Sequence, residues 1–167
     1  MQSRIKSPVQ TIPGSLEALR KLNDGAMQTG VPATTLLLVA IRASQINSCS
    51  VCTDMHTREL RQLGENETRL NMIAAWREAP YFTDAERAVL ALTEAATRIA
   101  DRPDAVTDAI WDEVAKHFDE RQLGAIVLAI ASINAWNRLN AVTRQITGEW
   151  VQQWIAPPGG AAAAKAA

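Results

Sequence analysis

The chain has 167 residues and a formal net charge of −1, from 17 basic and 18 acidic side chains. This length allows one domain to bury a substantial core, and near-zero charge without runs of one sign excludes an electrostatic affinity for nucleic acid or anionic membranes. The segment Met1 to Pro13 lacks the apolar core of a secretory signal, and no stretch approaches the roughly 20 apolar residues of a membrane span. We therefore expect a cytoplasmic protein with neither nucleic-acid nor membrane partners.

Apolar residues recur with a helical period almost throughout, which predicts an all-α orthogonal bundle of about seven helices. The expected helices cover residues 14–28, 33–47, 50–63, 67–78, 84–100, 107–118 and 119–147. Together they predict a single domain over residues 1–155. The remaining residues, 156–167, are rich in alanine, glycine and proline, and we expect this low-complexity tail to lie outside the fold.

Two of these segments, 33–47 and 123–136, are apolar on nearly every side of the helix. Such a pattern indicates burial on all faces. A chain of this size has limited room for two such helices, so we expect part of their apolar surface to be covered by another subunit.

The two cysteines of the chain, Cys49 and Cys52, stand in the pattern Cys-x-x-Cys-x-x-x-His that ends at His56. If Asn47 or Ser48 caps the helix that follows, Cys49 lies in its first turn, and all three side chains project from one face. A free thiol has a pKa of about 8.5, and both a helix N-terminus and a nearby imidazole favour the thiolate. The spacing therefore indicates redox or nucleophilic chemistry.

Three other interpretations of the cysteine pair are weaker. A structural zinc site needs further ligands, and the only other histidine, His117, is remote in the sequence. A structural disulfide over such a short loop removes little chain entropy. Two buried cysteines packing as small apolar residues stay open as an alternative, although an imidazole beside them fits an inert core poorly. No metal or other cofactor is expected.

The segment 42–56, together with 75–87, 92–95 and 133–139, resembles the alkylhydroperoxidase D-like branch of the carboxymuconolactone decarboxylase family. The resemblance implies an all-helical homotrimer or hexamer that reduces hydroperoxides, or disulfides, without metal or haem. It also implies recycling by an external dithiol, such as a thioredoxin-like or lipoyl reductant. Decarboxylases of the same family lack the cysteine pair, so lactone decarboxylation is the weaker alternative.

The resemblance also implies roles for the three residues of the motif. Cys52 corresponds to the peroxidatic thiol, which is oxidised to a sulfenic acid, and Cys49 to the partner that donates a proton and closes the disulfide. His56 corresponds to part of the proton relay. A thioredoxin-like mechanism would instead make Cys49 the nucleophile, and this alternative stays open.

One position departs from the pattern of the family. Better-known members carry a glutamate twelve residues before the first cysteine, where this chain has Leu37. We expect Glu94 to supply the missing carboxylate to His56, because it interrupts an apolar helix face and should point inward. The alternative is an ion pair of Glu94 with Arg98 or Arg42. The apolar Leu37 also leaves room for a non-catalytic redox sensor.

Overall fold

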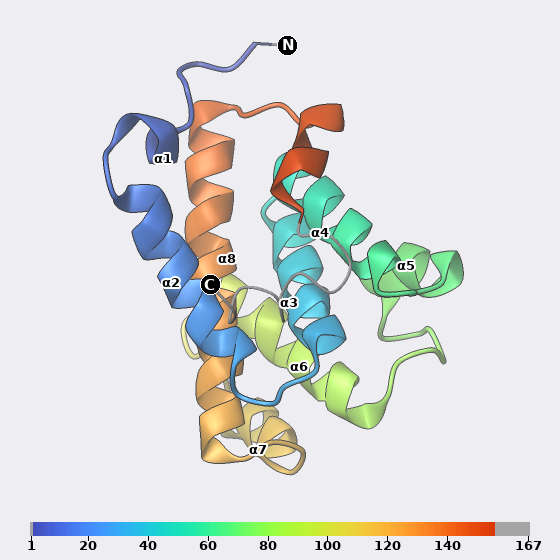
Figure 1. The fold of residues 1–167 in the computed structure, drawn as a ribbon. Helices are drawn as coiled ribbons and strands as arrows, with labels where there is room; N and C mark the ends of the chain where they lie inside the picture. Colours follow the sequence, from blue (N-terminus) through green and yellow to red (C-terminus); the bar gives the residue numbers. More distant parts are fainter. Residues whose placement is uncertain (1, 156–167) are drawn as a thin grey trace.

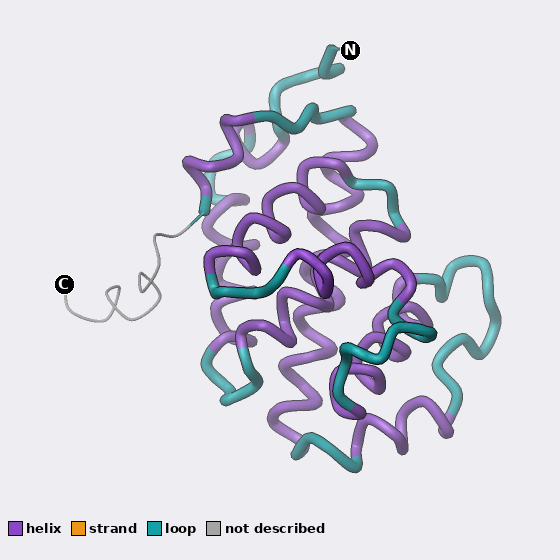
Figure 2. Tube along the Cα trace, turned by 90° about the vertical axis from the view of Figure 1, so that its right-hand side faces the viewer, coloured by secondary structure: helices purple, strands orange, loops and turns teal. Residues whose placement is uncertain are grey.

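The computed structural model describes residues 2–155, so the predicted tail lies outside the described residues. Residues 2–155 form helices without any strand, which confirms the all-α prediction (Figures 1 and 2). The elements are α1 (Pro8–Thr11), α2 (Ser15–Met27), α3 (Ala33–Ile46), α4 (Ser50–Gln62), α5 (Glu67–Met72), η1 (Ile73–Ala75), α6 (Asp84–Thr97), α7 (Asp108–Ala115), α8 (Glu120–Thr143) and η2 (Glu149–Trp154). The short α1 and η2 were not predicted.

Helix α3 lies at the centre of the bundle and packs against α4, α6 and α8 (Figure 1). Its side chains Leu36, Leu38, Val39 and Ile41 are buried on different sides of the helix. The apolar pattern of this segment is therefore largely satisfied within one chain.

Helix α8 is long and apolar enough to cross a membrane by length and composition alone, contrary to the sequence-based expectation. It nevertheless packs against α2, α3 and α6, and it buries the polar side chains of Ser132, Asn134 and Asn137. A core helix of a helical bundle passes the same composition test, and two buried amides of α8 bond to other helices of this protein: Asn134 to Thr97 of α6 and Asn137 to Ser44 of α3.

Capping signals define the starts of the two helices that surround α3. Thr83 and Glu86 form a capping box at the start of α6, and Asp119 and Gln122 form a second one at the start of α8. Gly64, with a φ of 90°, follows the end of α4. These signals fix where the helices begin and end around the cysteine motif.

Candidate active site

The cysteine motif begins at a sharp turn between α3 and α4. Ser48 adopts the left-handed conformation with a φ of 55°, and the backbone N–H of Cys49 donates to the carbonyl of Ser44 at 2.9 Å. Cys49 is therefore itself the N-cap of α4, and its Sγ accepts the backbone N–H of Cys52 at 3.4 Å. The predicted cap, Asn47 or Ser48, is wrong because the left-handed Ser48 moves the extended cap position on by one residue.

Buried amides hold this turn against α8. The side-chain N–H of Asn47 donates to the Oδ1 atoms of Asn134 and Asn137, both at 2.9 Å. Asn137 in turn donates to the hydroxyl of Ser44 at 3.0 Å. Hydrogen-bonded polar groups in a core fix one geometry, so this network sets the position of Cys49 relative to α8.

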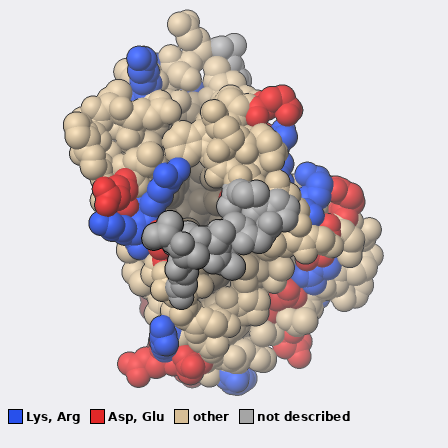
Figure 3. Space-filling model, viewed as in Figure 1, with Lys and Arg blue, Asp and Glu red and all other residues tan. Residues whose placement is uncertain are grey.

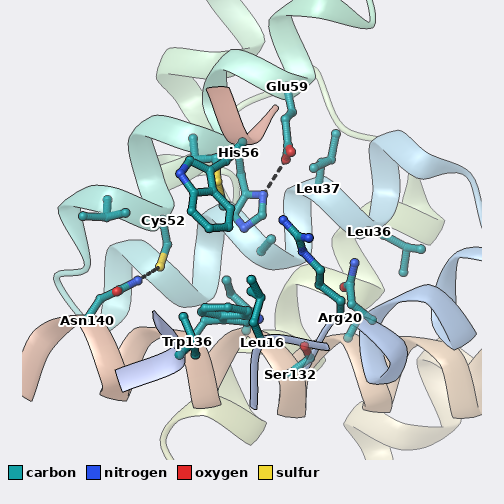
Figure 4. A pocket seen from close by; sticks show the side chains of 18 of the residues that line it. Leu16, Arg20, Leu36, Leu37, Cys52, His56, Glu59, Ser132, Trp136 and Asn140 are labelled. Atoms are coloured by element: carbon teal, nitrogen blue, oxygen red, sulfur yellow. Dashed lines mark hydrogen bonds and ion pairs between the residues drawn. The ribbon is translucent and has the colours of Figure 1, made fainter. Parts of the chain in front are cut away.

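The two thiols are free, buried and in direct contact. Their sulfur atoms lie 2.6 Å apart, so a Cys49–Cys52 disulfide requires only a small movement. The side-chain N–H of Asn140, on α8, donates to Cys52 Sγ at 3.2 Å (Figure 4). The pair thus has hydrogen-bond donors from both α4 and α8 to stabilise negative charge on sulfur.

One proton leaves this pair readily and the second does not. The pKa of Cys49 falls to about 6, first because of the hydrogen bond with Cys52, and further because of the Cys52 backbone N–H and the side-chain amides of Asn140 and Asn137; burial opposes this shift. The pKa of Cys52 rises, because its hydrogen bond with Cys49, burial and the charge on Cys49 all favour the neutral thiol. The lower pKa of the resting pair thus lies on Cys49 and the higher one on Cys52.

The thiolate of Cys49 should be measurable by its ultraviolet absorbance during a pH titration. We expect the absorbance to rise with a midpoint near the Cys49 pKa of about 6, since the charged form exists above that pKa. In Asn140→Ala the midpoint should move to higher pH, because one donor to the pair is lost. An Asn140→Ala midpoint equal to that of the wild type would show that the amide does not stabilise the thiolate.

His56 lies one helical turn after Cys52 on α4, and a carboxylate contacts its ring. Its Nδ1 and the Glu59 carboxylate are 2.6 Å apart, and both side chains are largely buried (Figure 4). An acceptor on Nδ1 orients the imidazole and leaves Nε2 free for proton transfer. Glu59 also stabilises the ring when it carries a second proton.

Glu94 belongs to a different cluster. Its carboxylate accepts from Arg42 Nε at 2.7 Å, from Trp76 Nε1 at 2.8 Å and from Arg77. Burial raises the pKa of Glu94, but the hydrogen bonds from Trp76, Arg42 and Arg77 outweigh it, and the pKa lies below its usual value. None of the contacts of Glu94 among residues 2–155 involves His56, so the ion pair with Arg42, the alternative left open by the sequence, is the arrangement found.

We expect Glu94→Gln to lower the stability of the protein and to leave its cysteine chemistry intact. The substitution leaves the part-buried Arg42 without its charged partner, which costs about 1–3 kcal/mol of unfolding free energy. Urea denaturation should therefore show a lower midpoint, while thiol alkylation rates at native conditions stay unchanged. A slower alkylation rate at unchanged stability would show instead that Glu94 acts on the cysteine pair.

A large pocket opens beside Cys52, with a volume of about 820 Å³. Cys52, His56 and Glu59 line it together with Leu37, which stands at the position of the glutamate that the resemblance implies for better-known members (Figure 4). Most of the remaining lining is apolar and includes Leu16, Met27, Leu36, Ala40, Met55, Ile133, Trp136, Trp150 and Trp154. A reacting molecule in this pocket would meet Cys52 and His56 within an apolar enclosure.

Cys49 lines a second pocket of about 580 Å³, which is more open and polar. Its other lining residues include Ser48, Ser50, Thr53 and Arg61. The two sulfurs of the pair therefore border different pockets. Within residues 2–155, no group of three or more His, Cys, Asp or Glu side chains is arranged to hold a metal ion.

Comparison with known proteins identifies the family of this chain. The model of the carboxymuconolactone decarboxylase family matches residues 13–95. The uncharacterized protein YdfG of Bacillus subtilis is 35% identical over 140 residues, which are 84% of this chain and 93% of YdfG. The chain belongs to the carboxymuconolactone decarboxylase family.

Solved structures of other proteins share the fold of this chain. ATU0492 of Agrobacterium tumefaciens, a protein of unknown function that has been proposed to be the antioxidant defence protein AhpD, is 32% identical with a TM-score of 0.82. The match covers 88% of this chain and 99% of ATU0492. The debrominase Bmp8 is 20% identical with a TM-score of 0.71, and the match covers 82% of this chain and 73% of Bmp8. At this level of identity the likeness to Bmp8 shows the fold alone.

Two residues of the site were missed by sequence reasoning. Glu59 follows His56 by three positions on one helix face, a spacing that already places the two side chains together. Asn140 continues the series Asn134, Asn137 at intervals of three on α8. In this member of the carboxymuconolactone decarboxylase family, a carboxylate thus reaches the histidine from α4.

Proposed function

We propose that this protein is a thiol-dependent hydroperoxide reductase with an antioxidant role. The observation that carries the proposal is the convergence of a thiol pair at 2.6 Å with the His56–Glu59 pair at one pocket. Membership of the carboxymuconolactone decarboxylase family and the likeness to ATU0492 support the antioxidant role.

In the proposed reaction Cys52 is the peroxidatic residue, because it borders the large pocket together with His56. Its proton passes to the adjacent Cys49 thiolate, which leaves Cys52 as the thiolate with Asn140 donating to it. Cys52 Sγ then attacks the terminal oxygen of the hydroperoxide, and the O–O bond breaks. The departing alkoxide takes a proton from the His56 imidazolium and leaves as an alcohol, or as water from hydrogen peroxide.

Resolution of the sulfenic acid uses the neighbouring thiol. Cys49 Sγ displaces the hydroxyl group of the Cys52 sulfenic acid, which leaves with the Cys49 proton as water and forms the disulfide. An external dithiol, thioredoxin-like or lipoyl, then resets the pair by exchange. We propose that this reductant attacks Cys49, because Cys49 borders the more open polar pocket.

A single-turnover experiment tests this function. Reduced protein is mixed with one equivalent of an organic hydroperoxide, and the product is digested and analysed by mass spectrometry. We expect a Cys49–Cys52 disulfide and one equivalent of alcohol, followed by steady turnover when dihydrolipoamide is added. Disulfide formation without turnover would favour the redox sensor, and an intact dithiol would contradict the proposal. The sensor was favoured by the apolar Leu37, and Glu59 now supplies a carboxylate to His56.

We propose that the protein assembles as a homotrimer or hexamer and acts in the cytoplasm, where a reducing environment keeps such a pair reduced. In the single chain, three apolar side chains of α8 are exposed to solvent: Val127 is 43% exposed, Leu128 41% and Val142 65%. Sedimentation at micromolar concentration should therefore show an oligomer, and Val142→Glu should weaken it. A stable wild-type monomer would contradict this assembly.

A further inference from the structure

The pocket beside Cys52 is far larger than a small peroxide requires. Its volume of about 820 Å³ falls in the range of roughly 300–1,000 Å³ that is typical of sites for drug-sized ligands. A water molecule, by contrast, occupies only about 30 Å³. Hydrogen peroxide would contact a small part of the wall, so the size of the pocket indicates a substrate with an extended body.

The wall also indicates the chemistry of that body. Aliphatic and aromatic side chains from α2, α3, α4, α8 and η2 surround the space, among them Leu36, Ala40 and Trp136. Burial of an alkyl chain against such a surface is favourable by about 0.8 kcal/mol per methylene group. The pocket is therefore suited to a hydrocarbon chain.

One basic side chain enters this apolar pocket. Arg20, on α2, points into it and stacks over the ring of Trp154, at 5.3 Å from the centroid (Figure 4). Carboxylates pair with six other arginines of residues 2–155, which are Arg42, Arg58, Arg61, Arg69, Arg77 and Arg98. Among the described residues that line this pocket, Arg20 is the only lysine or arginine. Arg20 has no carboxylate within ion-pair distance among residues 2–155, although Asp24 lines the same pocket.

The acidic groups of the pocket leave Arg20 available for an anion. Glu59 is engaged by His56, whereas Arg20 and Asp24 are both exposed to solvent and form no ion pair with each other. Arg20 comes from α2 and Cys52 from α4, so the basic group and the thiol belong to different walls. Figure 3 shows a hollow near the centre of the drawn face, with basic side chains at its left edge.

We propose that the substrate is the hydroperoxide of a long-chain carboxylic acid. Its carboxylate pairs with the Arg20 guanidinium, its alkyl chain fills the apolar pocket, and its hydroperoxide group lies at Cys52. A guanidinium binds a carboxylate through two parallel N–H donors, which gives both affinity and orientation. This assignment rests on the proposed function and extends it to a substrate class.

Binding of a redox-inert probe tests the pocket independently of catalysis. Decanoate below its micellar concentration and 1-decanol below its solubility limit are titrated while tryptophan fluorescence is followed, to which the pocket residues Trp136, Trp150 and Trp154 contribute. We expect decanoate to bind the wild type and to bind Arg20→Gln about ten- to a hundredfold more weakly, the range of a lost charged hydrogen bond. Decanol binding should be the same in both proteins, and Arg20→Lys should keep part of the preference for the anion.

A matched control removes the same charge outside the pocket. Arg102→Gln changes an exposed arginine that does not line the pocket, and it should bind decanoate like the wild type. Equal loss in both variants would show a general charge effect and overturn the role of Arg20. Failure of decanoate to bind the wild type would overturn the substrate class.

Turnover then separates this inference from the proposed function. The kcat/KM values are compared for linoleic acid hydroperoxide, its methyl ester and hydrogen peroxide. Arg20→Gln should lower kcat/KM for the acid about ten- to a hundredfold and leave the other two unchanged. Equal effects on all three would contradict the assignment. Absence of turnover with every peroxide would contradict the proposed function, while decanoate binding would still decide the chemistry of the pocket.

Discussion

Cys52→Ser should consume hydroperoxide at least about a thousandfold more slowly than the wild type, because a serine hydroxyl does not replace a thiolate nucleophile. We expect this loss of rate to be larger than that of any other single substitution, because Cys52 is the cysteine that lines the large pocket together with His56. The rate is measured as loss of an organic hydroperoxide in the presence of dihydrolipoamide. Circular dichroism and thermal unfolding should show that the variant remains folded.

Cys49→Ser provides the matched comparison, since it removes the other sulfur of the same pair. This variant should react with one equivalent of peroxide, stop, and retain a Cys52 sulfenic acid that dimedone traps. Its first reaction should also be slower at neutral pH, because the thiolate that accepts the Cys52 proton is absent. The opposite pattern, with Cys52→Ser retaining the first reaction, would make Cys49 the peroxidatic residue, as in the thioredoxin-like mechanism.

Glu59→Gln should slow hydroperoxide reduction by roughly a hundredfold, the usual contribution of general acid–base assistance. In the wild type the Glu59 carboxylate lies 2.6 Å from Nδ1 of His56. Glutamine keeps the shape of the side chain and a contact to Nδ1, but it carries no charge to stabilise the protonated imidazole. The variant should bind decanoate normally, since Glu59 is engaged by His56. Pre-steady-state oxidation of the thiol pair is the measurement, because it isolates the step that releases the alcohol.

Glu94→Gln is the control for this substitution, with the same chemical change at a carboxylate that Arg42 and Trp76 hold. It should oxidise at the wild-type rate per folded molecule. If Glu59→Gln also reacted at the wild-type rate, the imidazole would work without a carboxylate. The relay would then consist of His56 and the two thiols.

The helices and the cysteine motif could be predicted from the sequence because both depend on local spacing. The period of the apolar residues located the main helices, and Cys52 and His56 share a face since they are one turn apart on α4. The cap of α4 could not be predicted, because it depends on the left-handed backbone of Ser48 and on amides from α8. The spacing of residues along the chain predicts neither the backbone conformation of Ser48 nor the contacts of the α8 amides.

The assignment of Glu94 failed for a related reason. An acidic residue on an apolar helix face can be predicted to point inward, but its partner comes from other helices. Arg42 and Trp76 reach Glu94 in the folded chain, and neither is near it in sequence. The pocket was likewise not predictable, since its wall includes η2, a short helix that returns to the bundle after α8.

The capping of α4 by Cys49 has a consequence for the reduction potential of the pair. Above a pH of about 6 the reduced protein carries a thiolate that accepts the Cys52 backbone N–H, whereas a disulfide sulfur is a much weaker acceptor. Hydrogen bonds that favour the reduced form raise the potential and make the disulfide more oxidising. The start of α4 thus shifts the redox equilibrium of the pair toward the reduced form.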